Sequence, residues 1–273
     1  MIAFSLTINM ELIKKLRDLT GAGMVDCQKA LKEANNDLEK AIEILRKKGI
    51  SKAAKRTDRE ANEGVVKVAV NADNTEAYIL EMNSETDFVS RNEKFQAFAD
   101  QVLEIVKTTK PASLEALLSS PFEGSTVSES LDALSGTVGE KMIIKRFEIV
   151  SGATVAAYSH LGGRMGVLVV IDQPGKSEVA VDVAMQVAAA NPKYLVPAEV
   201  GQEEMDKERA IYREQLLKEG KPEAMVDKIL EGKMGKYYSE VCLMEQEFIK
   251  DDKKKVKDIL GGAAVTKFVR YAL

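Results

Sequence analysis

Few residues in this sequence could carry out covalent chemistry. The chain contains two cysteines, Cys27 and Cys242, and a single histidine, His160. A serine, histidine and aspartate triad would have to use His160, which has no nucleophile-elbow pattern around it. The cysteines are far apart in sequence and lack the spacing of metal ligands, so no cysteine and histidine zinc site is expected. These residues therefore disfavour an enzyme, and we expect no cofactor and no bound metal.

Phosphate-binding loops are also missing from the pattern. Residues 174–177, Pro-Gly-Lys-Ser, end as such a loop does but lack its first glycine, and they follow a predicted hairpin. No Gly-x-Gly-x-x-Gly follows a predicted strand. We therefore expect the chain to act without binding a nucleotide through a motif of its own.

The stretch from Glu81 to Glu93 could instead present a side chain to a partner. Residues 77–80 are apolar and predict a strand before it, and apolar residues at helical spacing predict a helix after it. Between these elements Phe88 and Val89 form an apolar pair that matches neither period. Phe88 either packs beneath the strand or forms an exposed apolar tip beside an acidic residue.

The start of the following helix has two interpretations. Ser90 and Glu93 form a Ser-x-x-Glu pattern, which predicts a cap at Ser90 and leaves Phe88 on the turn before the helix. A cap at Thr86 or Asp87 would instead place Phe88 in an exposed first helical turn. The local pattern leaves both open.

Composition sets wider limits on function. The 273 residues are 45% hydrophobic and 30% charged, with a net charge of −4, which predicts two or more globular modules and no general attraction to nucleic acid. Aromatic residues make up 5% and tryptophan is absent, which disfavours a stacking surface for single strands. Residues 1–8 do not resemble a signal peptide, and no stretch reaches the length of a membrane span. We expect a cytoplasmic protein.

Residues 9–49 predict three short helices. Gly21-Ala22-Gly23 breaks the first from the second, Asn36 and Glu39 mark the start of the third, and Gly49 stands where a helix C-cap belongs. The three predicted apolar faces are Leu12, Ile13, Leu16 and Leu19; Met24, Cys27, Ala30, Leu31 and Ala34; and Leu38, Ala41, Ile42 and Leu45. By this pattern Met24 belongs to the core.

An internal near-repeat follows, in which a β-hairpin precedes a helix. The predicted elements are strands at 64–70 and 77–80 with a helix at 91–106, and strands at 153–158 and 165–171 with a helix at 177–190. Residues 107–137 predict a surface connection with one short helix. Residues 138–150 predict a helix leading into a strand, with Ile143, Ile144 and Phe147 in the core. The fold class is therefore α+β, with two related subdomains.

The last third predicts a helical hairpin and a return to the core. Residues 199–217 and 223–238 are charged helices around Gly220-Lys221-Pro222, which predicts a projecting antiparallel pair. Residues 241–248 and a short helix at 256–260 follow, and 265–273 is a last strand.

Two segments resemble bacterial translation elongation factor Ts. Residues 16–31, Leu-Arg-Asp-Leu-Thr-Gly-Ala-Gly-Met-Val-Asp-Cys-Gln-Lys-Ala-Leu, are similar to its N-terminal signature, and residues 80–92 are similar to its core motif, with Thr-Asp-Phe-Val intact. The resemblance runs from about residue 9 to 273. Family members generally continue with a Gly-Glu-Gly turn and a helical tail, so this sequence, which ends at Leu273, is shorter there than the family pattern.

The resemblance implies a division into five segments. These are a ubiquitin-associated-like three-helix domain with a basic linker (1–56), a first core subdomain carrying the Thr-Asp-Phe-Val segment (57–147), a second core subdomain (148–198), a coiled-coil hairpin (199–240) and a C-terminal return to the core (241–273).

The resemblance also implies a partner and a set of contacts. The partner is elongation factor Tu, bound to GDP or nucleotide-free, in a homo- or hetero-oligomeric complex, with no membrane and no specific nucleic acid. The family's magnesium-dislodging segment corresponds to Thr86, Asp87, Phe88 and Val89, with Phe88 as the wedge. Its further contacts correspond to Arg17, Met24, Val25 and His160. The implied function is guanine-nucleotide exchange without covalent chemistry.

The basic residues between positions 46 and 59 suggest a second hypothesis. Seven lysines and arginines lie in residues 46–60 against Asp58 and Glu60, which is typical of a solvated helix and linker. The alternative function is an RNA- or ribosome-associated module that binds through this segment.

Overall fold

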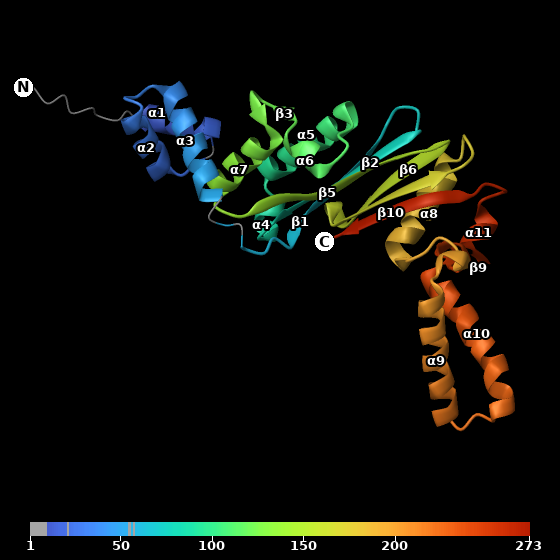
Figure 1. Cartoon of the computed structure of the whole chain (residues 1–273). Helices are drawn as coiled ribbons and strands as arrows, with labels where there is room; N and C mark the ends of the chain where they lie inside the picture. The colour runs from blue at the N-terminus through green and yellow to red at the C-terminus, as the bar shows by residue number, and fades with distance from the viewer. Residues whose placement is uncertain (1–9, 21, 54–55, 57) are drawn as a thin grey trace, which may run out of the picture. The chain divides into compact units, whose positions relative to one another are not determined.

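The N-terminal helices form a bundle with a core of its own. The structure is a computed structural model that describes residues 10–20, 22–53, 56 and 58–273. Helices α1 (Met10–Thr20), α2 (Met24–Glu33) and α3 (Leu38–Ala53) pack around buried side chains (Figure 1). These are Ile13, Leu16, Ala22, Cys27, Ala30, Leu31, Ala34 and Ala41. The predicted faces are confirmed except at Leu19, which is 59% exposed, and Met24, which is 51% exposed.

The sequence predicted that the third helix ends at a C-cap on Gly49. This prediction is wrong, because helix α3 continues to Ala53. Gly49 lies inside the helix, where α3 packs against α7 (Val127–Val138). A Cβ atom on Gly136 would lie 2.2 Å from the Gly49 Cα atom. Gly136 is therefore required for the close approach of the two helices, and a Cβ atom on Gly49 would itself lie 3.3 Å from the Ala133 backbone. A pattern within one helix cannot reveal such a crossing.

The first sheet has the strand order β1-β2-β5, from β1 (Glu63–Val70), β2 (Glu76–Ser84) and β5 (Met142–Ser151). The chain leaves β2 into the short helix α4 (Asp87–Ser90) and then α5 (Glu93–Thr109). Phe95, Phe98, Ala99, Val102, Leu103 and Val106 line the buried face of α5. The predicted hairpin and helix are confirmed, with α4 as an additional element.

The interpretation of residues 107–137 as a surface connection is wrong. Helix α6 (Leu114–Leu118) is the predicted short helix, but strands β3 (Pro121–Phe122) and β4 (Ser125–Thr126) and helix α7 follow it. Leu117 and Val127 are fully buried. Thr126 and Glu129 form a reciprocal capping box that starts α7, a signal that the abundance of serine and glycine concealed.

Residues 138–150 were predicted as a helix leading into a strand, and only the strand is confirmed there, as β5. Gly139 ends α7 with φ 92°, and β5 begins three residues later. Met142 and Ile144 are buried, whereas Ile143 and Phe147 are only half-buried, as the alternation of a strand requires. Ile143, Ile144 and Phe147, on which the prediction rested, all lie in β5, and helix α7 ends upstream of them at Val138.

The second sheet has the order β10-β7-β6, from β6 (Thr154–His160), β7 (Met165–Ile171) and β10 (Val265–Ala272). All neighbouring strands are antiparallel. Helix α8 (Ser177–Ala190) packs on one face, and their shared core includes Val167, Val169, Ile171, Val183 and Val187. The second predicted hairpin and helix are confirmed.

Helices α9 (Gln202–Lys218) and α10 (Glu223–Val241) form the predicted hairpin and lie side by side (Figure 1). Two small clusters join them, one around Leu216, Val226 and Leu230 and one around Met205, Met234 and Tyr237. The region after α10, for which the sequence predicted no element before the short helix at 256–260, contains the strands β8 (Glu247–Phe248) and β9 (Asp251–Lys255). The predicted short helix is α11 (Val256–Ile259).

The chain divides into two compact units. One comprises residues 1–67, 80–147 and 273, and the other comprises residues 68–79 and 148–272. The mixture of helices and sheets confirms the α+β class. Within the described part of the chain, no helix has the length and apolar character needed to cross a membrane.

Candidate protein-binding site

The turn after β2, residues 85–90, is here called the Phe88 turn. Thr86 is the N-cap of α4, and its hydroxyl accepts a hydrogen bond from the Val89 N–H at 3.4 Å. The Ser90 N–H donates to the Thr86 carbonyl at 3.2 Å, which closes the helical turn. The predicted cap at Ser90 is therefore wrong and the Thr86 alternative is correct, with Asn92 as the separate cap of α5.

Phe88 is the most exposed large apolar side chain in the described part of the chain, at 84%. Its neighbours Val89 and Ser90 are 8% and 5% exposed. A first helical turn sends successive side chains about 100° apart, so the cap at Thr86 buries Val89 and directs Phe88 outward. Contact with a partner would remove this apolar area from water, which is favourable at about 25 cal/mol per Å².

The acidic neighbour, Asp87, is held on the same helical turn. Its carboxylate pairs with the Arg91 guanidinium at 3.0 Å, one helical turn onward. The carboxylate also lies in the first turn of α4, where the helix dipole favours a negative charge. Asp87 thus supports the local turn and remains partly exposed beside Phe88.

Glu140 is a member of this site that sequence reasoning missed. Its carboxylate accepts hydrogen bonds from the Thr86 N–H at 3.0 Å and the Thr86 hydroxyl at 2.8 Å. The two residues are 54 positions apart, and an isolated Glu-Lys pair before a strand carries no signal for such a contact.

The strand beneath the turn contains a buried carboxylate. The Glu81 side chain is 0% exposed and pairs with Lys145 Nζ at 2.8 Å and Arg146 Nε at 2.7 Å. The two cations, on β5, remain about half exposed. Because a buried charge without partners is very costly, these pairs fix the end of β2 against β5 just before the Phe88 turn.

The residues matched to the family's N-terminal contacts lie on the bundle surface. Arg17 is exposed on α1, and Met24 and Val25 are 51% and 61% exposed at the start of α2. The placement of Met24 in the core is therefore wrong. A helix start that follows a glycine turn leaves its first residues without a neighbouring helix to cover them.

His160 ends β6 in the other compact unit. The side chain is exposed, its Nδ1 atom lies 2.9 Å from the Tyr158 hydroxyl, and the two rings stack with centroids 5.8 Å apart. Leu161 follows with φ 51° and 67% exposure. His160 thus ends its strand on the surface, next to Leu161, whose left-handed backbone conformation exposes an apolar side chain.

The two thiols are poor nucleophiles. Burial raises the pKa of Cys27, and burial raises the pKa of Cys242 to about 11. Because the thiolate is the reactive form, neither thiol is activated near neutral pH.

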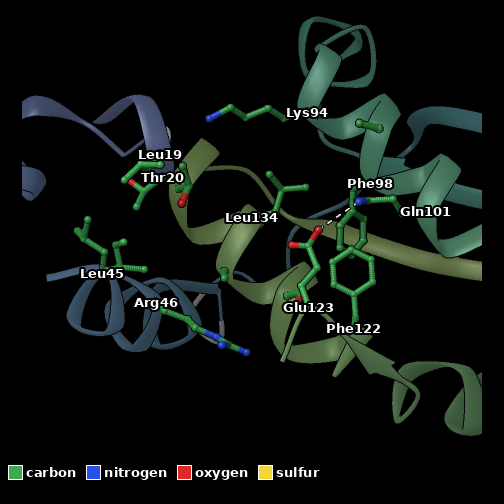
Figure 2. A pocket seen from close by; sticks show the side chains of 15 residues that line it. Leu19, Thr20, Leu45, Arg46, Lys94, Phe98, Gln101, Phe122, Glu123 and Leu134 are labelled. Atoms are coloured by element: carbon green, nitrogen blue, oxygen red, sulfur yellow. Dashed lines mark hydrogen bonds between the residues drawn. The ribbon is translucent and has the colours of Figure 1, made fainter. Parts of the chain in front are cut away.

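A pocket of about 440 Å³ lies within the first unit and is unrelated to Phe88 (Figure 2). Apolar side chains from several elements contribute to it, among them Leu19, Leu45, Phe98, Phe122 and Leu134. Phe98 and Phe122 are in contact, with ring centroids 5.1 Å apart. Glu123, which also lines the pocket, accepts a hydrogen bond from the Gln101 side chain at 3.2 Å.

Most of the basic residues from position 46 onward already have acceptors. Carboxylates pair with Arg46, Lys47, Lys48 and Arg59, and Arg56 donates to the Ser135 carbonyl at 3.2 Å. The side chains of Lys52 and Lys55 lie outside the described residues. The paired charges are less available for phosphate groups than the sequence suggests.

A comparison with known protein families identifies a family that the chain matches. The family model described as "Elongation factor TS" matches residues 85–273, which is more than half of the chain. The match begins at Glu85, so it includes the whole Phe88 turn.

Proposed function

The chain belongs to the elongation factor Ts family, and on that premise we propose that it is the guanine-nucleotide exchange factor for elongation factor Tu. Membership gives it a role in translation elongation. In the proposed reaction it binds the GDP-bound partner, displaces the elements that hold the magnesium ion, and leaves the partner free to bind GTP.

One observation carries this proposal, the 84% exposure of Phe88 on a capped turn. An exposed phenyl ring on a fixed support can enter a partner as a wedge. Asp87 lies beside it, and we propose that Thr86, Asp87 and Phe88 form the magnesium-dislodging segment. Val89, which is buried, serves the segment by anchoring it.

The energetics require no catalytic acid or base. A protein that binds nucleotide-free partner more tightly than GDP-bound partner weakens GDP binding by the same factor, because coupling between two sites is reciprocal. Loss of contacts to magnesium removes the largest positive charge beside the phosphates. The proposal therefore agrees with a site that presents an apolar ring and a carboxylate rather than a nucleophile.

Further contacts are proposed for the exposed residues of the other segments. Arg17, Met24 and Val25 on the three-helix bundle, which we propose is ubiquitin-associated-like, would bind the partner's GTPase domain. His160 would make a secondary contact, and α9 with α10 would act as a coiled coil. The five segments bounded at residues 56, 147, 198 and 240 are proposed as the working domains.

The test is the release of fluorescent GDP from elongation factor Tu in the presence of magnesium. Truncation of an aromatic anchor at an interface costs about 2 kcal/mol or more, so Phe88→Ala should slow release at saturation by more than ~tenfold. Its thermal midpoint should equal that of the wild type, because the removed ring is exposed.

Ile249→Ala is the matched control, since Ile249 is an exposed apolar residue, at 48%, outside the proposed contacts. It should accelerate release as the wild type does. If the wild type fails to accelerate GDP release, the proposed function is wrong. The alternative RNA-binding function instead predicts salt-dependent RNA affinity that Phe88→Ala leaves unchanged.

A further inference from the structure

Two carboxylates join the Phe88 turn to the loop before β5 in opposite directions. Glu140 accepts the Thr86 N–H at 3.0 Å, and Glu85 accepts the Lys141 N–H at 2.6 Å. Each segment thus supplies one glutamate side chain, which accepts a hydrogen bond from a backbone N–H of the other segment. We call Glu85 and Glu140 the carboxylate clamp.

The loop that carries Glu140 is itself anchored. The Ser135 hydroxyl donates to the Glu140 carbonyl at 2.6 Å, and the Gly139 N–H donates to the Ser135 carbonyl at 2.8 Å. Both bonds fix the loop to the last turn of α7. The clamp therefore connects the Phe88 turn to a helix of the core rather than to another free loop.

The other half of the clamp is similarly supported. Arg59 Nη1 lies 3.1 Å from the Glu85 carboxylate, and the Lys141 ammonium donates to the Arg59 carbonyl at 2.7 Å. The Glu85 side chain is only 21% exposed. A partly buried carboxylate with these donors has a defined orientation, so it restrains the residue immediately before Thr86.

Glu140 also determines how the Thr86 hydroxyl can act as a cap. A hydroxyl has one hydrogen to donate and can accept through its lone pairs. Donation to Glu140 at 2.8 Å leaves the lone pairs for the Val89 N–H at 3.4 Å. The carboxylate thus selects the hydroxyl orientation that caps α4, and the capped α4 turn directs Phe88 outward.

We propose that Glu140, together with Glu85, is a positioning residue for nucleotide exchange, which holds the Phe88 turn in its binding conformation before the partner arrives. This inference rests on the exchange function proposed above. Glu140 acts through its hydrogen bonds to Thr86, which orient the Phe88 turn, and it needs no direct contact with the partner.

The proposal predicts a particular kinetic signature. If only a fraction of free molecules has the binding conformation, the apparent affinity falls by that fraction, whereas the saturated complex is unchanged. Loss of the clamp should therefore raise the half-saturating concentration and leave the maximal rate of GDP release intact. Loss of the wedge, in Phe88→Ala, should instead lower the maximal rate.

The experiment measures GDP release from elongation factor Tu against the concentration of full-length protein. Hydrogen bonds to charged groups are strong enough that losing two of them in Glu140→Ala should raise the half-saturating concentration ~tenfold. Glu140→Gln retains length and one acceptor oxygen, so its value should lie between those of the wild type and Glu140→Ala. The matched control is Glu115→Gln, an exposed glutamate on α6, which should behave as the wild type.

A double variant tests whether Glu140 acts through the wedge. In the Phe88→Ala background, adding Glu140→Ala should change the half-saturating concentration by less than ~twofold, because residues that act as a unit are not additive. A further ~tenfold increase would overturn the proposal, since Glu140 would then act elsewhere.

Hydrogen exchange provides a readout without the partner. In Glu140→Ala the Thr86 and Val89 amides should exchange at least ~tenfold faster, while amides of α5 remain protected. Glu85→Ala, which removes the other carboxylate of the clamp, is the second variant should Glu140→Ala fail to fold, and it should raise the half-saturating concentration in the same way.

The failure of this inference differs from the failure of the proposed function. If the wild type accelerates release and Phe88→Ala impairs it, but Glu140→Ala and Glu85→Ala match Glu115→Gln, only the positioning role is wrong. A fall in maximal rate alone for both variants would also overturn it. If the wild type does not accelerate release at all, the exchange function itself is wrong.

Discussion

Two helix starts in this protein present apolar side chains, and they are supported in different ways. The Phe88 turn begins with Thr86, whose hydroxyl caps α4 and is itself held by Glu140. The start of α2, residues 23–26 and here called the Met24 turn, begins with Gly23, which has no side chain and makes no side-chain cap. Its regular backbone hydrogen bond, from the Cys27 N–H to the Gly23 carbonyl, is 2.9 Å long.

The difference indicates two ways to present an exposed apolar side chain, one on a restrained turn and one on an adaptable turn. Hydrogen bonds to a segment distant in sequence hold the Phe88 turn in one conformation. Binding through the Phe88 ring would therefore cost little conformational entropy. The Met24 turn depends on the packing of Cys27 behind it and leaves Met24 and Val25 on an uncapped end. An unbranched methionine suits such a surface because it adapts to the shape of its partner.

The largest expected effect comes from changing shape at each turn. Phe88→Leu should slow GDP release ~tenfold, or about 1.4 kcal/mol, because a fixed turn cannot move to fill the space left by the ring. Met24→Leu should change it less than ~twofold, because that turn adjusts. Equal losses in the release assay would contradict the comparison.

A smaller effect should appear in the dependence of stability on pH. The Lys141 N–H, and then the Arg59 guanidinium, hold the pKa of Glu85 below its usual value. A lowered folded-state pKa stabilises the protein above the unfolded-state pKa, and this stability is lost as pH falls through the folded-state value. The wild type should therefore exceed Glu85→Gln in unfolding free energy at pH 7, and the gap should close as the pH falls below the usual carboxyl pKa and through the lowered folded-state pKa of Glu85.

Urea unfolding at a series of pH values measures this gap. Glu115→Gln is again the control, and its difference from the wild type should stay near zero throughout. A Glu85→Gln gap that is constant from neutral to acidic pH would show that the charge of Glu85 does not support the turn.

The smallest expected effect is a gain. Gly23 has φ −61° and ψ 147°, and a Cβ atom there would meet nothing within 4 Å. Gly23→Ser should cap α2 and restrict the unfolded chain, which together stabilise the bundle by about 0.5 kcal/mol. Thermal unfolding measures the gain.

Two other glycines serve as controls for this prediction, one with an expected gain in stability and one with an expected loss. Gly201, the uncapped start of α9, has φ −62° and open space around it, so Gly201→Ser should give a similar gain. Gly220 has φ 74°, and Gly220→Ser should destabilise the protein because a side chain disfavours that conformation. A loss at Gly23 comparable to that at Gly220 would show that the Met24 turn needs glycine for another reason.

Much of the architecture could be predicted from local patterns. The alternation of strands β6 and β7, the helical period of α8 and the break at Gly220-Lys221-Pro222 each act within a few residues, so their elements appeared where expected. The stretch around Phe88 was recognisable as a site by its motif. Helix α7 and the β8–β9 hairpin were missed, because serine-rich and lysine-rich segments hide the periods of their few buried residues.

Sequence alone determined the inventory at the Phe88 turn: an apolar pair, an acidic residue and two competing caps. Tertiary structure decided between Thr86 and Ser90, because Glu140 lies 54 residues away and supplies the acceptor that makes the Thr86 cap the stable one. It likewise decided that Gly49 serves a helix crossing and that Met24 lies on the surface. Hydrogen bonds and contacts between segments distant in sequence leave no periodic signal in the sequence. Only the folded chain therefore shows which of several locally possible residues caps a helix, allows a helix crossing or lies on the surface.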